Sequence, residues 1–142
     1  RGDAGARIDA AVLWVQLDPV SGRPQRLDAG FAAVYGPSAR GRTVRARLQL
    51  DDGVPPRAAT RPFPVRACDL DVLGHVNNAV YWSMLGECLD GGDGGPGRFE
   101  LEHLYPVAAG SVLVLHHVDG RLWVGDGDRV AAVARWGPPV SR

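Results

Sequence analysis

Two side chains that can move protons lie four residues apart near the middle of this 142-residue chain. Asp71 can act as a general base toward water, or attack a carbonyl carbon directly. His75 can orient that carboxylate, donate to a carbonyl oxygen or protonate a leaving group, because imidazole titrates near neutral pH. Each has a simpler alternative, since Asp71 could cap a helix and His75 could be structural. From these two residues alone the capping role is favoured for Asp71, and a catalytic pair held by a loop is the alternative.

A helix predicted over residues 78–90 supplies the other half of such a site. We expect Asn78 to be its N-cap, although Asn77 and Asn78 could simply be a cap and a turn residue. The start of a helix offers main-chain N–H groups and a positive dipole end, which bind a carbonyl oxygen and the oxyanion formed from it. Gly74 lacks a Cβ and lets a ligand approach the backbone. The residues expected to position a substrate are Gly74, Val76, Asn77 and Asn78.

The elements around this helix predict a mixed fold. The helix is apolar nearly all round, which indicates burial on most sides. A short helix is expected after Asp28, over the FAAVY segment and ending at Gly36-Pro37. Asp119-Gly120 is a hairpin turn signal. Strand patterns cover residues 8–17, 43–50, 63–69, 98–107, 111–118, 121–125 and 129–136. We therefore expect an α+β fold in which an antiparallel sheet wraps around one central helix.

The segment from Val65 to Leu89 resembles the hotdog-fold acyl thioesterases, especially the acyl-acyl carrier protein thioesterases. Their signature is a strand ending in D-x-D, two residues, G-H-V-N-N, two more residues and a Tyr. The matching residues are Asp69, Asp71, Gly74, His75, Val76, Asn77, Asn78 and Tyr81, with Glu87 further along the helix. The resemblance implies the hotdog fold, with the strands after residue 97 completing its sheet.

The same resemblance implies an activity. The expected reaction is hydrolysis of a fatty acyl thioester, carried by acyl carrier protein or coenzyme A, to free fatty acid and thiol, as in cytoplasmic fatty acid biosynthesis. Asp71 and His75 would be catalytic, and neither a metal nor an organic cofactor is required. Glu87 could reach the site as the helix carboxylate does in one hotdog branch, or could bind only Arg66 or solvent. Tyr81 is expected to be a packing residue.

The resemblance also implies how the chain is organised. Residues 8–17, with Trp14, look like the last strand of a preceding hotdog, as in double-hotdog members. We expect residues 1–60 to hold that tail, a short helix and a linker, and residues 61–142 to form the hotdog thioesterase domain. The first residue is Arg1 rather than Met, so the chain is expected to begin inside a longer protein. The active site would lie between two hotdogs, in a homodimer or an intrachain double hotdog.

Two departures from the family pattern limit the expected mechanism. Plant acyl carrier protein thioesterases carry an Asn where this chain has Leu73, and a Glu near where Pro106 falls. Neither side chain can supply those polar groups. What remains is the simpler arrangement of one Asp with helix-terminal N–H groups.

Two other functions fit parts of the pattern. A hotdog dehydratase or hydratase would use a His with a helix acid, which His75 and Glu87 could mimic, but an HFPG-type loop is missing. A non-catalytic acyl-binding module would explain the lost Asn and Glu, but the intact Asp71 argues against decay.

Composition excludes several other classes. The formal net charge is zero, so no basic surplus indicates nucleic-acid binding. No apolar run approaches the ~20 residues of a membrane span. Cys68 and Cys88 are expected to be small buried residues in a reducing compartment, and a Cys88–His75 nucleophile pair is disfavoured by the apolar helix. Adjacent strand residues such as His116-His117 face opposite ways and cannot share a metal, and His103 is expected on a strand surface.

Overall fold

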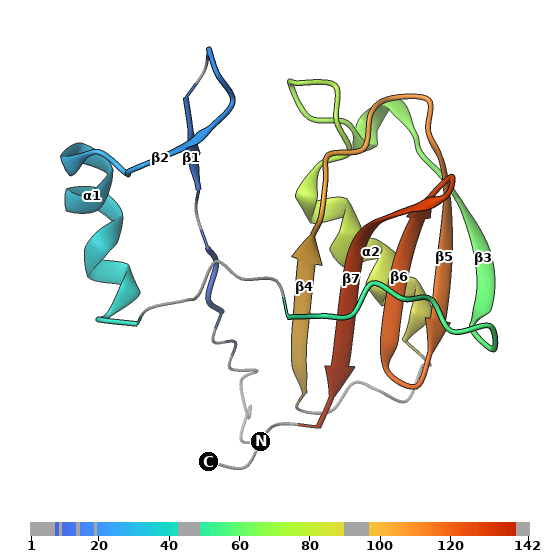
Figure 1. Cartoon of the computed structure of the whole chain (residues 1–142). Helices are drawn as coiled ribbons and strands as arrows, with labels where there is room; N and C mark the ends of the chain where they lie inside the picture. The colour runs from blue at the N-terminus through green and yellow to red at the C-terminus, as the bar shows by residue number, and fades with distance from the viewer. Residues whose placement is uncertain are drawn as a thin grey trace, which may run out of the picture. The chain divides into compact units, whose positions relative to one another are not determined.

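The computed structural model describes residues 8, 10–13, 15–18, 20–42, 49–89 and 97–138. The chain divides into two compact units, Arg1–Arg47 and Leu48–Arg142. Figure 1 shows the elements of both units, which are described separately below.

The first unit holds a short ladder and one helix. Strands β1 (Gln16–Leu17) and β2 (Pro24–Gln25) pair antiparallel, and α1 spans Ala29–Ala39. Asp28 caps α1 as expected, because its Oδ1 accepts a hydrogen bond from the Phe31 N–H at 2.7 Å. The helix runs past the predicted stop, with Pro37 in its last turn and Arg40 ending it at a φ of 50°.

Two strands were predicted in the first half of the chain, over residues 8–17 and 43–50. The strand predicted over residues 8–17 is confined to β1, and the other described residues of that range are not in a strand. Four of them have exposed apolar side chains that no described strand covers: Ile8, Val12, Leu13 and Val15. Most of the strand predicted over 43–50 lies outside the described residues.

The second unit is an antiparallel sheet with a helix on one face, and the expected α+β fold is confirmed. The strands are β3 (Ala59–Pro64), β4 (Arg98–His103), β5 (Val112–Val118), β6 (Arg121–Asp126) and β7 (Arg129–Gly137). Their order is β3-β5-β6-β7-β4, which leaves β3 and β4 at the edges. The helix α2 (Asn78–Cys88) lies across one face (Figure 1). Asp119 and Gly120 both have positive φ, 49° and 68°, as the predicted β5–β6 hairpin requires.

The core lies between α2 and the inner face of the sheet. The helix buries one side rather than its whole circumference, since Trp82 is 48% exposed. The prediction of burial on most sides was wrong for this unit, because among the described residues a single sheet face covers the helix. The core residues are Tyr81, Met84, Leu85 and Cys88 of α2 with Leu113, Leu115, Leu122, Val124, Ala132 and Ala134 of the sheet.

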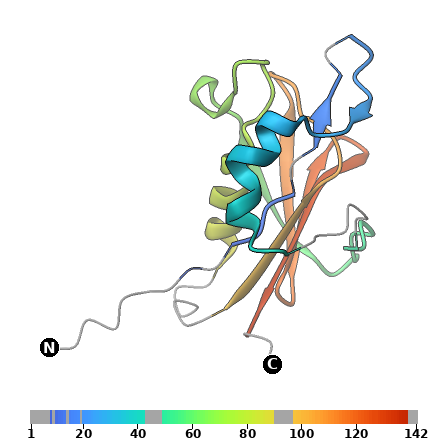
Figure 2. The same ribbon diagram turned by 90° about the vertical axis from the view of Figure 1, so that its left-hand side faces the viewer.

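The opposite face of the sheet is covered by residues 49–58, the segment that precedes β3. Figure 2 shows this segment and α2 on opposite sides of the strands. The Trp123 indole Nε1–H donates to the Asp51 carbonyl at 2.9 Å, and the Glu102 carboxylate accepts the N–H groups of Gln49 and Leu50. Trp123 is consequently only 1% exposed. The sheet that supports α2 is therefore held from both faces.

An ion pair fastens the connection between β3 and α2. The strand predicted over 63–69 ends at Pro64, and a single 3-10 turn follows over Ala67–Asp69. The Asp69 carboxylate, 2% exposed, accepts hydrogen bonds from the Arg66 N–H at 2.8 Å and from its guanidinium Nε and Nη2 at 3.0 and 2.8 Å. The Asp69 carbonyl accepts the Asn77 N–H at 2.8 Å. Asp69 thus ties the end of β3 to the start of α2.

Replacing Asp69 should make the free energy of unfolding depend less on pH, because the Asp69 carboxylate anchors the loop only when it is charged. Its hydrogen bonds from Arg66 hold the pKa of the carboxyl below its ordinary value of 3.8. The stabilisation is therefore complete above that value and is lost as pH falls below it. We expect Asp69→Asn to lower the free energy of unfolding by on the order of 1 to 2 kcal/mol at neutral pH, and the difference from wild type to shrink below about pH 4, measured by urea unfolding.

The matched control is Asp119→Asn, which removes an exposed ion pair with Arg57. That change should stay within about 0.5 kcal/mol. An Asp69→Asn deficit no larger than the control, or one that grows in acid, contradicts the anchoring role.

Candidate active site

The segment between Asp69 and α2 is a closed loop. Leu70 and Val76 form an antiparallel bridge, and the Asp71 N–H donates to the His75 carbonyl at 2.7 Å. The Gly74 N–H donates to the Asp71 carbonyl at 3.0 Å, and Gly74 has a φ of +76°. Side chains other than glycine rarely adopt this conformation, so the turn itself requires glycine here. The space beside the Gly74 Cα is open, as a close-approaching ligand would need.

The Asp71 carboxylate faces its own loop with one oxygen. Oδ1 accepts the N–H groups of Leu73 at 2.9 Å and His75 at 3.0 Å, and the residue is half-buried. In the part of the chain that the structure describes, Oδ2 makes no hydrogen bond. Asp71 therefore acts as a loop cap, the simpler alternative from the sequence, and also keeps one oxygen free to accept a proton.

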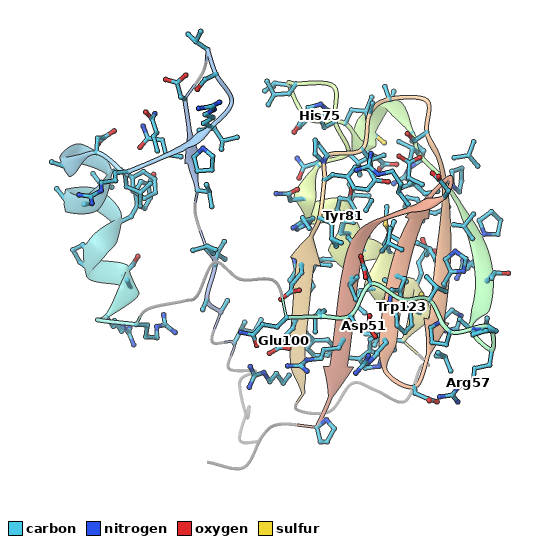
Figure 3. The ribbon with its side chains drawn as sticks, viewed as in Figure 1. Asp51, Arg57, His75, Tyr81, Glu100 and Trp123 are labelled. Atoms are coloured by element: carbon cyan, nitrogen blue, oxygen red, sulfur yellow. The ribbon has the colours of Figure 1, made fainter. Side chains whose placement is uncertain are left out.

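His75 is fixed by its backbone. Its N–H donates to Asp71, its carbonyl accepts from the same residue, and it bridges to Ala108. His75, which is labelled in Figure 3, is half-buried. Among the described residues the imidazole makes no hydrogen bond to the Asp71 carboxylate. The orienting role expected for His75 stays a prediction.

Most N–H groups in the loop are already used by the protein. Those of Gly74 and His75 donate to Asp71, that of Val76 to the Val107 carbonyl at 2.8 Å, and that of Asn77 to the Asp69 carbonyl. None of these four is available to an oxyanion in this conformation.

The first turn of α2 leaves one donor. Asn77, not Asn78, is the N-cap: its backbone is extended at a ψ of 135° and its Oδ1 accepts the Ala79 N–H at 2.9 Å. The Val80 N–H donates to the Asn77 carbonyl. Between Gly74 and Val80, only the Asn78 N–H is without a hydrogen bond to a described residue. The broad set of expected donors therefore narrows to Asn78.

The expected helix carboxylate is not at this loop. Glu87 lies nine residues after Asn78, about 13 Å along the helix. Its carboxylate forms an ion pair with Arg61 of β3 at 2.9 Å, and Arg61 also donates to the Glu87 carbonyl. Glu87 thus pairs with Arg61 rather than with Arg66, because β3 lies beside this end of α2. A catalytic role for Glu87 stays a prediction.

The two cysteines have different environments. Cys88 is buried at the same far end of α2, and burial raises the pKa of its thiol, so it is a packing residue. Cys68 is exposed in the 3-10 turn, contrary to expectation, because that turn lies on the surface.

A group of buried polar side chains below α2 was missed in the sequence. His103 is partly buried rather than on the surface, and its ring meets Tyr81 edge-on with centroids 4.8 Å apart. Burial lowers the pKa of His103 and raises the pKa of Tyr81 to about 12. The alternation of β4 could have placed His103 on the inner face with Leu101, had its register been known.

The described residues contain no group of three or more His, Cys, Asp or Glu side chains placed to hold a metal. None of the described helices is both long and apolar enough to cross a membrane.

Comparison with known proteins agrees with the fold and the loop. The family model of the acyl-ACP thioesterase C-terminal domain matches residues 55–121. An uncharacterized protein of Mycobacterium tuberculosis is 30% identical over 143 residues, covering 95% of this chain and 57% of that protein. The chain thus spans little more than half the length of the curated relatives it matches.

Solved structures show the same architecture. The 12:0-ACP thioesterase of Umbellularia californica matches with a TM-score of 0.59 and 23% identity, over 87% of this chain and 53% of that one. A putative oleoyl thioesterase of Lactobacillus plantarum matches with a TM-score of 0.62 and 18% identity, over 90% and 55%. At these identities the likeness concerns the fold. The second unit is therefore a hotdog-fold domain, and over residues 55–121 it is similar to the C-terminal domain of the acyl-ACP thioesterases.

Proposed function

We propose that this protein hydrolyses acyl thioesters at the loop between β3 and α2. The observation that carries the proposal is a pair of polar groups, one on the closed loop and one at the start of α2, that make no hydrogen bond to the described residues. The Asp71 Oδ2 can accept a proton, and the Asn78 N–H can donate at the positive end of the helix. A thioester needs a donor for its carbonyl oxygen and a base or nucleophile for its carbon.

The reaction follows from these two groups. The thioester carbonyl oxygen accepts the Asn78 N–H, which also stabilises the negative charge that this oxygen acquires. Asp71 removes a proton from water while the water oxygen bonds to the carbonyl carbon, or its carboxylate attacks that carbon first and water then cleaves the anhydride. The C–S bond breaks, and the products are a carboxylic acid and a thiol. We assign protonation of the departing thiolate to His75, on the same loop.

The finer assignments extend this proposal. The substrate would be a fatty acyl group carried by acyl carrier protein or coenzyme A, in keeping with the family match. Gly74, Val76 and Asn77 would position the substrate by shaping the loop rather than by donating to it. A second hotdog, from another copy or from a longer chain whose tail is residues 1–60, would complete the cleft.

Removal of the Asp71 charge tests the base directly. In Asp71→Asn the amide oxygen can still accept the Leu73 and His75 N–H groups, so the loop is expected to keep its shape while losing its proton acceptor. We expect kcat for acyl-coenzyme A and acyl-acyl carrier protein substrates to fall by roughly a hundredfold or more, measured by thiol release. The matched control is Asp128→Asn in the exposed β6–β7 turn, which should keep the wild-type rate. Unchanged turnover in Asp71→Asn would reject the assignment of Asp71.

A proline substitution isolates the Asn78 N–H. Asn78 is the first residue of α2, where proline fits a helix, and the extended backbone of Asn77 suits the position before proline. Asn78→Pro should therefore fold but lose its donor, and we expect kcat to drop by roughly 10²–10³. Asn78→Ala keeps the N–H and should lose far less. Circular dichroism checks that α2 persists in both variants, and equal losses in the two would show that the main-chain donor is not used.

A further inference from the structure

Two buried polar atoms on the β4 side of the core have no partner. They are the His103 Nε2 and the Tyr105 hydroxyl oxygen, neither of which has a described partner at hydrogen-bond distance and angle. The main chain of Asn78 lies near the imidazole and the Asp126 carboxylate lies near the hydroxyl. Buried donors and acceptors are nearly always paired, because an unpaired one forfeits its bonds to water. Two such atoms, two residues apart in the sequence, indicate a place where a polar group from outside the fold binds.

The position of His103 places this site next to the reacting group. His103 ends β4, the edge strand, whose outer side no strand of the described sheet covers. Its ring packs against Tyr81 of α2, one turn after Asn78. The main chain of Asn78 lies close enough to the imidazole to oppose the effect of burial on its pKa. His103 thus lies beneath the helical turn whose free N–H would hold the thioester carbonyl.

The protonation of the His103 imidazole and the Tyr105 hydroxyl indicates which kind of ligand group could bind them. Burial lowers the pKa of His103 and so favours the neutral ring, in which Nε2 is either a donor or an acceptor. Burial, and then the nearby Asp126 carboxylate, raise the pKa of Tyr105, which keeps its proton. The Arg129 guanidinium lies 3.7 Å from the centre of the Tyr105 ring and helps to fix it. A hydroxyl group both donates and accepts, so it satisfies both atoms with either histidine tautomer.

We propose that His103 and Tyr105 bind a hydroxyl substituent near the thioester end of the acyl chain, so that the preferred substrates are β-hydroxyacyl thioesters. The inference rests on the proposed hydrolysis, because the Asn78 N–H fixes the thioester above His103. A substituent within the first few carbons is the one that can reach the imidazole from that point. His103 and Tyr105 are specificity residues in this proposal, and Asp71 remains the base.

The experiment compares β-hydroxyacyl-coenzyme A with the unsubstituted acyl-coenzyme A of the same chain length. Thiol release is followed for wild type, His103→Phe, Tyr105→Phe and His117→Phe. We expect wild type to favour the hydroxyacyl substrate by roughly tenfold in kcat/KM, the size of one buried hydrogen bond. His103→Phe keeps an aromatic ring against Tyr81 but removes the nitrogen, and should bring the ratio close to one. Tyr105→Phe should reduce it, and His117→Phe on β5 should retain it.

The possible outcomes separate this inference from the proposed function. Hydrolysis of both substrates at equal rates by wild type, or a preference that survives in both His103→Phe and Tyr105→Phe, overturns the hydroxyl site and leaves the thioesterase intact. If His103→Phe does not fold, as judged by thermal unfolding, Tyr105→Phe decides. Loss of water from the hydroxyacyl group without thiol release overturns both the inference and the hydrolase proposal. No reaction with either substrate, including acyl carrier protein forms, rejects the proposed function and the inference with it.

Discussion

In the proposed mechanism, one main-chain donor governs the chemistry that this fold performs. A helix begins with N–H groups that have no partner within the helix. Here the loop before α2 and the Asn77 cap use those groups for the protein itself, from Gly74 through Val80, and leave the Asn78 N–H. A single unsatisfied donor at a helix terminus, on a loop that also presents a carboxylate oxygen, defines where a carbonyl group would bind.

The rest of the second unit keeps that donor in place. The Asp69–Arg66 ion pair joins the end of β3 to the Asn77 N–H, so the loop cannot open without exposing a buried carboxylate. The bridge from His75 to Ala108 and the Val76 N–H bond to Val107 connect the loop to the segment before β5. Below, the buried face of α2 packs on the sheet, and the segment before β3 covers the other face through Trp123. The loop is therefore connected to β3, to the segment before β5 and, through α2, to the sheet.

Much of this arrangement could be predicted from local sequence. The order of strands after residue 97, the Asp119-Gly120 turn and the α2 helix follow from periodicity and turn chemistry, which are local properties. The motif from Asp69 to Asn78 indicated the family. The cap was displaced by one residue, since Asn77 and Asn78 are both suitable caps and only backbone dihedrals distinguish them. The strand over 8–17 was overpredicted because a strand needs a neighbour that local apolar character cannot supply.

Residues that depend on tertiary contacts were not predictable. Glu87 faces Arg61 because β3 lies beside the end of α2, a fact of sheet order rather than of helix spacing. His103 is partly buried because β4 pairs with β7 in a register that places it opposite Ala132. Which loop N–H groups bind the protein itself, and which are left for a ligand, likewise depends on tertiary contacts. The sequence therefore suggested several donors, whereas among the described residues between Gly74 and Val80 only the Asn78 N–H has no protein partner.

The most direct measurement of the central claim follows the loop amides while a substrate-like carbonyl binds. The probe is a ketone analogue of acyl-coenzyme A in which a methylene replaces the thioester sulfur, so that binding occurs without cleavage. In ¹H–¹⁵N correlation spectra the account predicts a downfield shift of the Asn78 amide proton on saturation, larger than the shifts of Gly74, Val76 and Asn77. Saturable binding that leaves the Asn78 amide unmoved would contradict it.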